Sequence, residues 1–397
     1  MNVNWTKSTL GDSLSLIRNG VNCKQDKSGI GDKISRIETI ASAQVNLERV
    51  GFSILTKEQK EKYKLQQGDI LFSHINSTVH VGKTAYIDDD YPLYHGINLL
   101  LIRAADNIDP GYLELFLRGL FWSGYWERIC KKSVNQASVN QTDIKKTPFQ
   151  YPPLEEQKQI VAKLDQCFEA IDKAKANATK NLENAKELFQ SKLNDIFSQK
   201  GEGWVEKKLG EISDVTYGFT DKSVEVGDFR YVRITDIDNN GELISTGKKY
   251  IGSSKDGKKF ILKDNDILMA RTGATFAKLL LYKDIEPSIF ASYLIKIDFT
   301  ESIDNEFYWF YAKSNSYWDQ ANTLSTGSAQ PHFNGKALKQ VLFPYPVSKT
   351  EQSRLINEFK RFQSKTQSLE SKYQQELNSL EELKKSILQK AFEGELV

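Results

Sequence analysis

An internal repeat constrains this chain of 397 residues more than any other feature. Its matched segments, first copy then second, are Trp5–Asp12 and Trp204–Glu211, Gly20 and Gly218, Gly68–Ser73 and Asn265–Ala270, Leu99–Ile102 and Tyr293–Ile297, Asp109–Leu113 and Asp304–Tyr308, Gln136–Asn140 and Gln330–Asn334, and Phe149–Pro153 and Phe343–Pro346. The offset falls smoothly from 199 to 194 residues, as a few loop insertions or deletions would produce. Because chance does not preserve such an order, the repeat predicts two similar structural units.

The periodicity of the sequence changes after the proline-rich end of each copy. Proline cannot sit inside a helix, so it separates the preceding strand from the next element. Beyond it, apolar or small residues recur at spacings of four and three, which is a heptad pattern. The first seam is Ile160, Leu164, Cys167, Ile171, Ala174, Ala178, Asn181, Ala185 and Leu188, slipping to Phe189, Leu193 and Ile196. The second is Leu355, Phe359, Phe362, Thr366, Leu369, Tyr373, Leu377, Leu380, Ile387 and Ala391.

These patterns predict an α+β fold with a pseudo-twofold internal repeat. Two similar α/β domains, residues 1–153 and 201–346, are separated by two long helices, residues 154–200 and 347–397. We expect the helices to pair with each other as an antiparallel coiled coil, since their seams have similar lengths. Packing of each helix on its own domain, or on a partner protein, is the alternative.

Composition limits the classes of function. The chain has 54 basic and 52 acidic residues and a net charge of +2, so any basic footprint for nucleic acid must be local. The three cysteines form no CxxC pair, which argues against a disulfide framework or a zinc site. No apolar run of about 18 residues and no signal-peptide pattern occurs, so we expect a cytoplasmic protein without membrane contact.

No reaction has an obvious site in the sequence. Gly82-Lys83-Thr84 matches the end of a phosphate-binding loop, but Ser77 stands where that pattern requires glycine. No Asn-Pro-Pro-Tyr segment, Ser/His/Asp arrangement or His/Glu metal cluster stands out. We therefore expect a non-catalytic chain that binds no metal or cofactor itself. A stand-alone nuclease or methyltransferase is the alternative.

Several motifs together resemble those of one known family. They are the two Trp-x4-Leu-Gly openings, the two Asp-Ile-Leu segments, the Glu156-Gln157 and Glu351-Gln352 helix starts, and the terminal Leu388–Leu396 segment. Over the whole chain they resemble the specificity subunits of type I restriction–modification systems. Where the second copy has Arg271-Thr272-Gly273, the first has Ser73-His74-Ile75-Asn76-Ser77. That divergence is expected if the two halves read different DNA sequences.

The resemblance implies two target-recognition domains, each of which reads one half of a bipartite double-stranded DNA target. It implies that the paired helices set the spacer and dock two modification (methyltransferase) subunits, with restriction (translocase/nuclease) subunits completing the enzyme. It also implies that S-adenosylmethionine, ATP and Mg²⁺ are bound only by those partners. Two alternatives remain: a specificity subunit of a related type II system, and a coiled-coil adaptor that holds two protein-binding modules apart.

Two polar segments in each half suit DNA contact. Phosphates attract cations and hydrogen-bond donors, and base edges are read by Arg, Asn, Gln, Ser and Thr. The candidate DNA-binding residues are His74, Asn76, Ser77, Thr78, Lys83, Asn135, Gln136, Ser138 and Asn140 in the first half, and Arg271, Thr272, Thr275, Lys278, Thr326, Ser328, Gln330, His332 and Asn334 in the second. Arg271 is the strongest, because its planar guanidinium can pair with guanine or clamp a phosphate.

Two further groups of residues have competing interpretations. The basic run Lys248-Lys249, with Lys255, Lys258 and Lys259 nearby, is either a phosphate footprint or an exposed hairpin. The tryptophans in the aromatic-rich stretches, Trp122, Trp126, Trp309 and Trp318, suit core packing better than base stacking. The cation-bearing loops argue against the adaptor, which would more often present apolar anchors.

Overall fold

The computed structural model describes residues 5–134, 136–252, 257–326 and 332–395, except for the side chains of Lys258 and Ala274. The chain forms two compact units. Unit 1 consists of residues 1–178 and 375–397, and unit 2 of residues 179–374. Each unit therefore contains one globular domain and one section of each long helix, α5 (Leu154–Gln199) and α10 (Lys349–Phe392).

The elements of the two globular domains follow in the same order. Those of unit 1 are β1 (Thr6–Thr9), β2 (Leu14–Asn19), β3 (Asp32–Ile34), β4 (Gly51–Ser53), α1 (Lys57–Tyr63), β5 (Ile70–Phe72), β6 (Ile75–Asn76), β7 (Thr84–Tyr86), β8 (Leu93–Tyr94), β9 (Leu100–Ala104), α2 (Pro110–Trp122), α3 (Tyr125–Ile129), β10 (Lys131–Ser133), β11 (Gln136–Ser138), α4 (Gln141–Lys145) and β12 (Pro148–Tyr151). Those of unit 2 are β13 (Trp204–Lys208), α6 (Leu209–Ile212), β14 (Ser213–Tyr217), β15 (Phe229–Val232), β16 (Tyr250–Ile251), β17 (Ile267–Ala270), β18 (Leu279–Leu281), β19 (Ser288–Phe290), β20 (Leu294–Phe299), α7 (Asn305–Tyr311), α8 (Asn315–Leu324), α9 (Gly335–Leu338) and β21 (Leu342–Pro346).

The two units share three sheets, and unit 1 has a further one of the order β10-β11-β6. A four-stranded antiparallel sheet has the order β2-β9-β5-β7 in unit 1 and β14-β20-β17-β18 in unit 2. A three-stranded sheet with one parallel pair has the order β4-β3-β8 in unit 1 and β16-β15-β19 in unit 2. The first and last strands of each domain also pair, β1 with β12 and β13 with β21. The repeat in the sequence is therefore a repeat of topology, and the predicted α+β fold class is confirmed.

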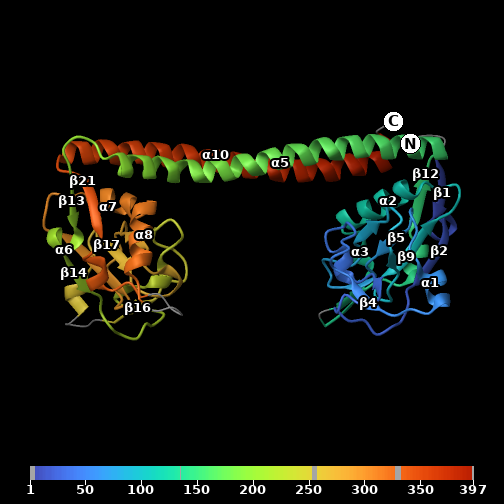
Figure 1. The fold of residues 1–397 in the computed structure, drawn as a ribbon, viewed down its shortest axis with the longest axis horizontal. Helices are drawn as coiled ribbons and strands as arrows, with labels where there is room; N and C mark the ends of the chain where they lie inside the picture. Colours follow the sequence, from blue (N-terminus) through green and yellow to red (C-terminus); the bar gives the residue numbers. More distant parts are fainter. Residues whose placement is uncertain (1–4, 135, 253–256, 327–331, 396–397) are drawn as a thin grey trace. The chain divides into compact units, whose positions relative to one another are not determined.

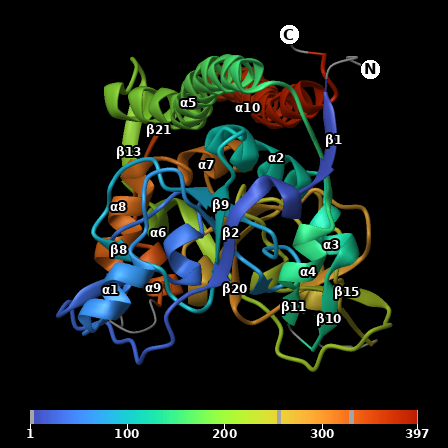
Figure 2. The same ribbon diagram turned by 90° about the vertical axis from the view of Figure 1, so that its right-hand side faces the viewer.

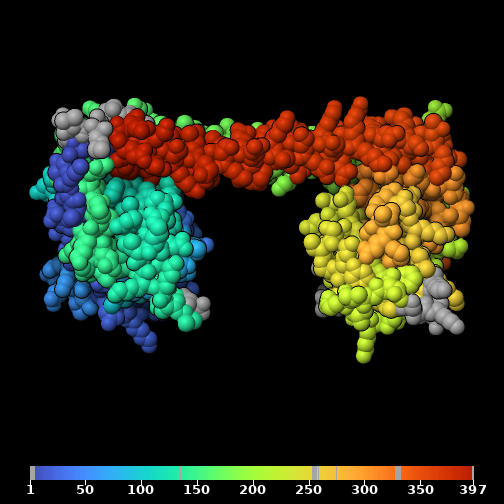
Figure 3. Space-filling view, turned by 180° about the vertical axis from the view of Figure 1, so that it is seen from behind, coloured from blue at the N-terminus to red at the C-terminus, as the bar shows by residue number. Residues whose placement is uncertain are grey.

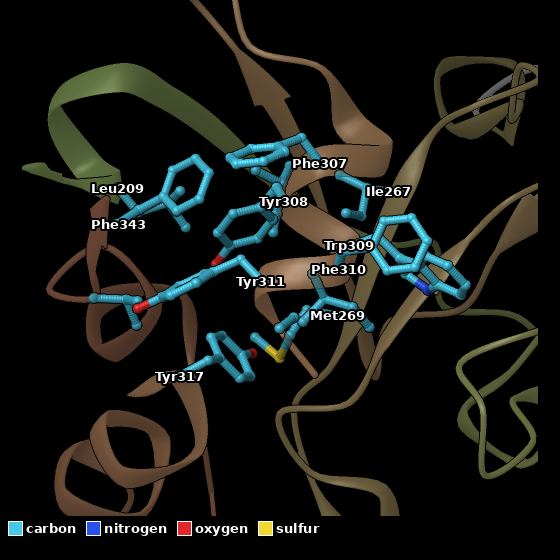
Figure 4. Packing of buried hydrophobic residues seen from close by; sticks show 14 of the residues in the cluster. Leu209, Ile267, Met269, Phe307, Tyr308, Trp309, Phe310, Tyr311, Tyr317 and Phe343 are labelled. Carbon is cyan, nitrogen blue, oxygen red and sulfur yellow. The ribbon is translucent and has the colours of Figure 1, made fainter. Parts of the chain in front are cut away.

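The Asp-Ile-Leu segments form the central strands β5 and β17 of these sheets. Successive residues of a strand face opposite sides, so one buried strand feeds two cores. In β17, Ile267 and Met269 join an aromatic cluster, whereas Leu268 joins the cluster on the other face. Figure 4 shows the aromatic side, where Phe307 and Tyr311 of α7 pack beside the strand. In Figure 1, α7 lies between this sheet and the long helices of unit 2, and α2 has the same place in unit 1.

The long helices run antiparallel within unit 1. Lys384 Nζ donates to Asp172 Oδ1 at 2.7 Å, and Lys175 pairs with Glu381. As the residue number increases along α5, the number of the paired residue in α10 decreases, so the two helices run in opposite directions. In the described part of the chain, no helix is both long enough and apolar enough to span a membrane.

The second section of the pair, in unit 2, has the same orientation. Phe197 stacks on Phe359 with ring centroids 5.7 Å apart, and Lys186 and Glu370 line one pocket farther along. The predicted antiparallel pairing is confirmed in each section.

The buried seam differs from the predicted one at several positions, among them Asn181, which is exposed, and Leu388, which is buried beside the predicted Ile387. Leu188 and Leu369 are 46% and 36% exposed, although the heptad spacing predicts both in the seam. Phe168 and Phe197 are buried, each one residue beyond the predicted position. The reason is that each helix packs against the globular domain as well as against its partner. Its buried stripe is therefore wider than a coiled-coil seam and shifts toward the domain.

The core of each globular domain includes the far end of a long helix. In unit 1, Leu388 and Ala391 of α10 are completely buried, and the ring of Phe392 is 5.1 Å from that of Tyr112. In unit 2, Leu193 and Phe197 near the end of α5 have the equivalent role. Figure 3 shows the last turns of α10, in red, directly against the teal surface of unit 1. Leu388, Ala391 and Phe392 of the terminal motif thus belong to a domain core.

The repeated glycines end strands β2 and β14 at places where two backbones meet. A Cβ atom on Gly20 would overlap the carbonyl groups of His95 and Gly96, and one on Gly218 would overlap that of Ala291. Only glycine permits so close an approach. At these glycines the backbone turns away from the four-stranded sheet.

Candidate nucleic-acid interface

The two polar segments predicted in the first half lie side by side in unit 1. Strand β6 belongs to the segment after the Asp-Ile-Leu strand, and β11 belongs to the segment before the proline-rich end. They pair with Asn76 opposite Ala137 and Ile75 opposite Ser138, and β11 also pairs with β10. Figure 2 shows β10, β11 and α4 close together in this unit. Segments about 60 residues apart in the sequence therefore form one surface.

Unit 2 repeats this pairing with fewer bonds. Thr272 forms a bridge with His332, which also bridges Thr326. The backbone amide of Phe333 donates to the carbonyl oxygen of Arg271 at 2.9 Å. The Thr272–His332 bridge occupies the place of the Ile75–Ser138 pair in unit 1. The candidates Asn135, Ser328 and Gln330 lie outside the described residues.

The predicted side chains differ in how far they reach solvent. Gln136, Thr326 and His332 are exposed, and Asn76, Ser77, Thr78, Ser138, Arg271 and Thr275 are partly exposed. His74 and Thr272 are buried, with only 8% and 5% of their surface exposed. These two side chains therefore lie under the polar surface and have little contact with solvent.

The repeated asparagines cap the helices that follow. Asn140 Oδ1 accepts from the backbone amide of Asp143 at 2.8 Å, at the start of α4. Asn334 Oδ1 accepts from the amides of Lys336 and Ala337 at 3.0 Å, at the start of α9. N-capping accounts for asparagine at both positions. The repeat of this residue therefore has a structural cause that contact with DNA does not require.

Two candidate lysines form hydrogen bonds to loops next to these surfaces. Lys83 Nζ donates to the carbonyl oxygen of Ala41 at 2.7 Å, and Lys278 Nζ donates to that of Asp238 at 3.1 Å. Among the described residues, no carboxylate forms an ion pair with either ammonium group. Each ammonium group thus lies beside the polar surface with backbone oxygen as its partner.

Arg271 is held between two tyrosine rings that the sequence did not single out. Its guanidinium carbon lies 5.5 Å from the ring centroids of both Tyr217 and Tyr293. The Tyr217 hydroxyl accepts from the backbone amide of Gly335 at 2.8 Å, which fixes one ring. Cation–π contacts of this kind orient the guanidinium plane without neutralising its charge. In the sequence, the one feature that could have marked Tyr217 is its position directly before the repeated Gly218.

The equivalent positions of unit 1 carry different chemistry. Aligning the paired strands places Asn19 at the position of Tyr217 and Asn98 at that of Tyr293. Asn19 Oδ1 accepts from Gln141 Nε2 at 2.8 Å, which joins the same two segments that the Tyr217 hydroxyl joins in unit 2. The two units therefore present different side chains on one framework.

The basic run around Lys248 is largely compensated by acids. Lys248 Nζ lies 2.7 Å from Glu286 Oε2, and Lys249 pairs with Glu225. Lys255 lies outside the described residues, and the side chain of Lys258 is not described. These ion pairs leave little excess charge at Lys248 and Lys249 for a phosphate.

The core tryptophans behave as the sequence predicts. Trp126 is fully buried and Trp309 is 6% exposed, so packing is their role. Within the described residues, no group of three or more His, Cys, Asp or Glu side chains is placed to hold a metal ion.

Unit 1 contains a buried histidine, His95, whose pKa is lowered. His95 is completely buried, and its Nε2 lies 3.0 Å from the carbonyl oxygen of Leu99. Burial lowers the pKa of His95 to about 4. In unit 2 the equivalent position is Phe290, whose carbonyl, like that of His95, accepts from the strand that follows the repeated glycine.

We expect His95 to cost unit 1 roughly 2 kcal/mol of stability between pH 7.5 and pH 5, and His95→Phe to remove this contribution, while His74, whose pKa burial also lowers, contributes separately. The folded pKa lies below the unfolded value of about 6.5, so the unfolded chain takes up the proton first as pH falls. Urea unfolding at several pH values, followed by hydrogen exchange in unit 1, measures the effect. His80→Phe, at an exposed position, is the control. An unchanged pH slope in His95→Phe would contradict the assignment.

The model of one protein family matches both halves of the chain. It is described as the type I restriction modification DNA specificity domain, and it matches residues 2–184 and 201–379. The chain belongs to this family. The resemblance inferred from the repeated motifs is therefore confirmed.

Curated members of the specificity-domain family are similar over different parts of the chain. The putative type I restriction enzyme MjaX specificity subunit of Methanocaldococcus jannaschii is 37% identical over 235 residues, which are 58% of this chain and 53% of that protein. The EcoKI specificity subunit of Escherichia coli is 27% identical over 46% of this chain and 40% of its own. The matches thus span about half the length of these two relatives. The StySPI specificity subunit of Salmonella potsdam is 26% identical over 85% of this chain and 76% of its own.

Solved structures share the fold over nearly the whole chain. One, from work on complex assembly and conformational transition of the type I R-M system, has a TM-score of 0.77 at 17% identity and covers 100% of this chain and 99% of its own. The HsdS subunit from Thermoanaerobacter tengcongensis has a TM-score of 0.64 at 18% identity, covering 100% and 98%. At such low identity these likenesses show the fold alone.

Proposed function

We propose that this chain is the specificity subunit of a type I restriction–modification enzyme, and that each unit reads one half of a bipartite double-stranded DNA target. The observation that carries the proposal is the pairing of the same two polar segments in both units, β6 with β11 and Thr272 with His332. The proposed reading domains are residues 1–153 and 201–346. Membership of the family favours this function over an adaptor.

The chemistry of the two surfaces supports reading of two different half-sites. Sequence is read by side chains that reach base edges, while cations and amides hold the phosphates. Unit 2 offers Arg271, oriented by two tyrosines, whereas unit 1 offers Asn19 and Asn98 at the flanking positions. One framework with different side chains suits two different base sequences.

We further propose the partners and the division of labour. The long helices α5 and α10 pass through both units, which suits a role in setting the spacer and docking two methyltransferase subunits. Restriction subunits would complete the enzyme. S-adenosylmethionine, ATP and Mg²⁺ would be bound by these partners and not by this chain. Incubating the isolated chain with DNA, S-adenosylmethionine and Mg²⁺ tests this point, and turnover by the chain alone would overturn it.

Arg271→Ala is expected to weaken binding of the cognate duplex by about 10- to 100-fold, because an oriented Arg contact contributes ~1–3 kcal/mol. Arg271→Lys should retain part of the phosphate attraction but not the planar fork. Methylome sequencing of a host carrying the chain and its methyltransferase first identifies the target. Fluorescence anisotropy of the assembled complex then measures affinity across salt concentrations.

The matched control is Arg361→Ala, at an exposed position on α10. Substituted duplexes should show that Arg271→Ala relaxes discrimination in one half-site only. Affinity that does not depend on salt would refute the DNA-reading proposal, since phosphate contacts release counterions.

A further inference from the structure

Helices α2 and α7 occupy equivalent places in the two units, so their residues can be compared one by one. Each begins after an aspartate whose side chain caps the helix. Aligning these caps makes Glu114 equivalent to Trp309 and Arg118 equivalent to Lys313. The alignment of the neighbouring strands, β7 with β18, makes Thr84 equivalent to Leu279.

In unit 1 the cation at this place has a built-in counter-charge. Arg118 Nη2 lies 2.8 Å from Glu114 Oε2, and Glu114 is only 3% exposed. The Thr84 hydroxyl donates to Glu114 Oε1 at 2.9 Å. A buried carboxylate that is both paired and hydrogen-bonded is a satisfied arrangement.

In unit 2 the cation remains but the acid is gone. Trp309 replaces the carboxylate and Leu279 replaces the threonine, and Lys313 Nζ lies 3.3 Å from the centroid of the Trp309 ring. Among the described residues no carboxylate forms an ion pair with Lys313. Burial lowers the pKa of Lys313 to about 8, against the opposing attraction of Glu242, Asp238 and Glu306, none of which forms an ion pair with it. Figure 4 shows Trp309 on the side of α7 opposite Tyr311.

Lys313 lines a pocket whose other groups are also suited to an anion. The pocket has a volume of about 440 Å³, within the range of small-ligand sites. Lys186 of α5 and Lys278 beside β18 line it with Lys313, and Glu370 is the one acidic residue of its lining among the described residues. Amides of Asn239 and Gln367 add hydrogen-bond donors. The described lining therefore carries three lysines and one acidic residue.

We propose that this pocket of unit 2 binds a phosphate group, which supplies the counter-charge that Glu114 supplies in unit 1. The lysine ammonium groups and the two amides match the oxygen-rich, dianionic character of phosphate. The phosphate comes either from a free ion or nucleotide or from a DNA backbone. The inference stands on the comparison of the units and does not depend on the DNA-reading proposal.

The test is NMR of the full-length chain with ¹³C-labelled lysine side chains. Lys313→Met identifies the Lys313 signal, and Lys283, which bonds Asn265 outside the pocket, serves as the reference lysine. Inorganic phosphate at constant ionic strength should shift the Lys313 signal saturably and raise the pKa of Lys313, while the Lys283 signal stays in place. Chloride at the same ionic strength should have no such effect.

A charge-adding variant tests the same site without disturbing the core. Gln367 is exposed on α10, so Gln367→Glu places a second carboxylate in the pocket lining at little cost to folding. It should weaken phosphate binding about tenfold, the effect of one charge-assisted contact. Gln375→Glu, exposed on the same helix outside the pocket, should leave binding unchanged.

A parallel titration with duplex DNA distinguishes the two sources of phosphate. If inorganic phosphate shifts the Lys313 signal, the site takes free phosphate. If only a duplex shifts it, and Lys313→Met removes part of the salt dependence of duplex binding, the site takes a backbone phosphate. If neither moves the signal, or Lys283 moves equally, the proposal is overturned, and this result leaves the Arg271 test of DNA reading unaffected.

Discussion

Leu388→Ala is expected to lower the free energy of unfolding of unit 1 by about 3–5 kcal/mol and to leave unit 2 unchanged. Leu388 is completely buried in the core of unit 1 although it lies nine residues before Val397. It packs there with Ile160 and Leu164 of α5 and beside the aromatic contact between Phe392 and Tyr112. Removing the side chain loses apolar burial and leaves a cavity.

Hydrogen exchange during mild urea unfolding measures the effect unit by unit, because local opening reports local stability. Leu383→Ala is the control, since Leu383 is 46% exposed on the same helix. Leu193→Ala is the reciprocal variant: it removes a buried side chain of α5 from the core of unit 2 and should spare unit 1. Equal losses in both units from either variant would contradict the division of the cores.

Gln352→Ala is expected to lower the free energy of unfolding of unit 2 by roughly 3–6 kcal/mol, as three backbone groups lose their partner. The Gln352 side chain is completely buried. Its Oε1 accepts from the amide of Asp304 at 2.8 Å, and its Nε2 donates to the carbonyls of Ser302 at 3.1 Å and Pro346 at 2.8 Å. These bonds tie the start of α10 to the cap of α7.

The reciprocal variant is Gln157→Ala, which should affect unit 1 alike. Gln157 Oε1 accepts from the amide of Asp109 at 2.8 Å, and its Nε2 donates to the carbonyl of Pro152 at 2.9 Å. Gln352→Glu keeps the shape but turns a carboxylate oxygen toward two carbonyls, so it should be as harmful as alanine. Gln375→Ala, on the exposed side of α10, is the control. Near-UV circular dichroism during unfolding measures each loss of stability. If Gln352→Ala left the stability of unit 2 unchanged, the role assigned to these hydrogen bonds would be wrong.

The Glu-Gln pairs illustrate how far a sequence motif leads. Their repetition marked the starts of α5 and α10, and the structure gives the reason, because a buried glutamine needs the same three backbone partners in each unit. The sequence also placed the two polar segments of each candidate interface. It did not find Tyr217 and Tyr293, since nothing in their local pattern distinguishes a ring that orients Arg271 from an ordinary strand residue.

The heptad seams were predicted less well than the helices that carry them. Helix formation follows from local periodicity and the absence of proline and glycine. Which residue of a turn is buried depends on what packs against it, and Phe197 contacts both the other helix and the aromatic core of unit 2. When a helix also packs against a second neighbour, its buried stripe shifts. The heptad rule for two paired helices does not account for this shift.

The order of amino acids by itself determined the duplication, the α+β class, the two long helices and the family, because periodicity and repeated motifs are local or countable properties of a chain. The tertiary structure alone decided which separate segments meet: β6 with β11, Arg271 with its two tyrosines, and Lys313 with the Trp309 ring where Arg118 has Glu114. These are contacts between residues far apart in the chain, and their energies depend on burial and charge that exist only after folding.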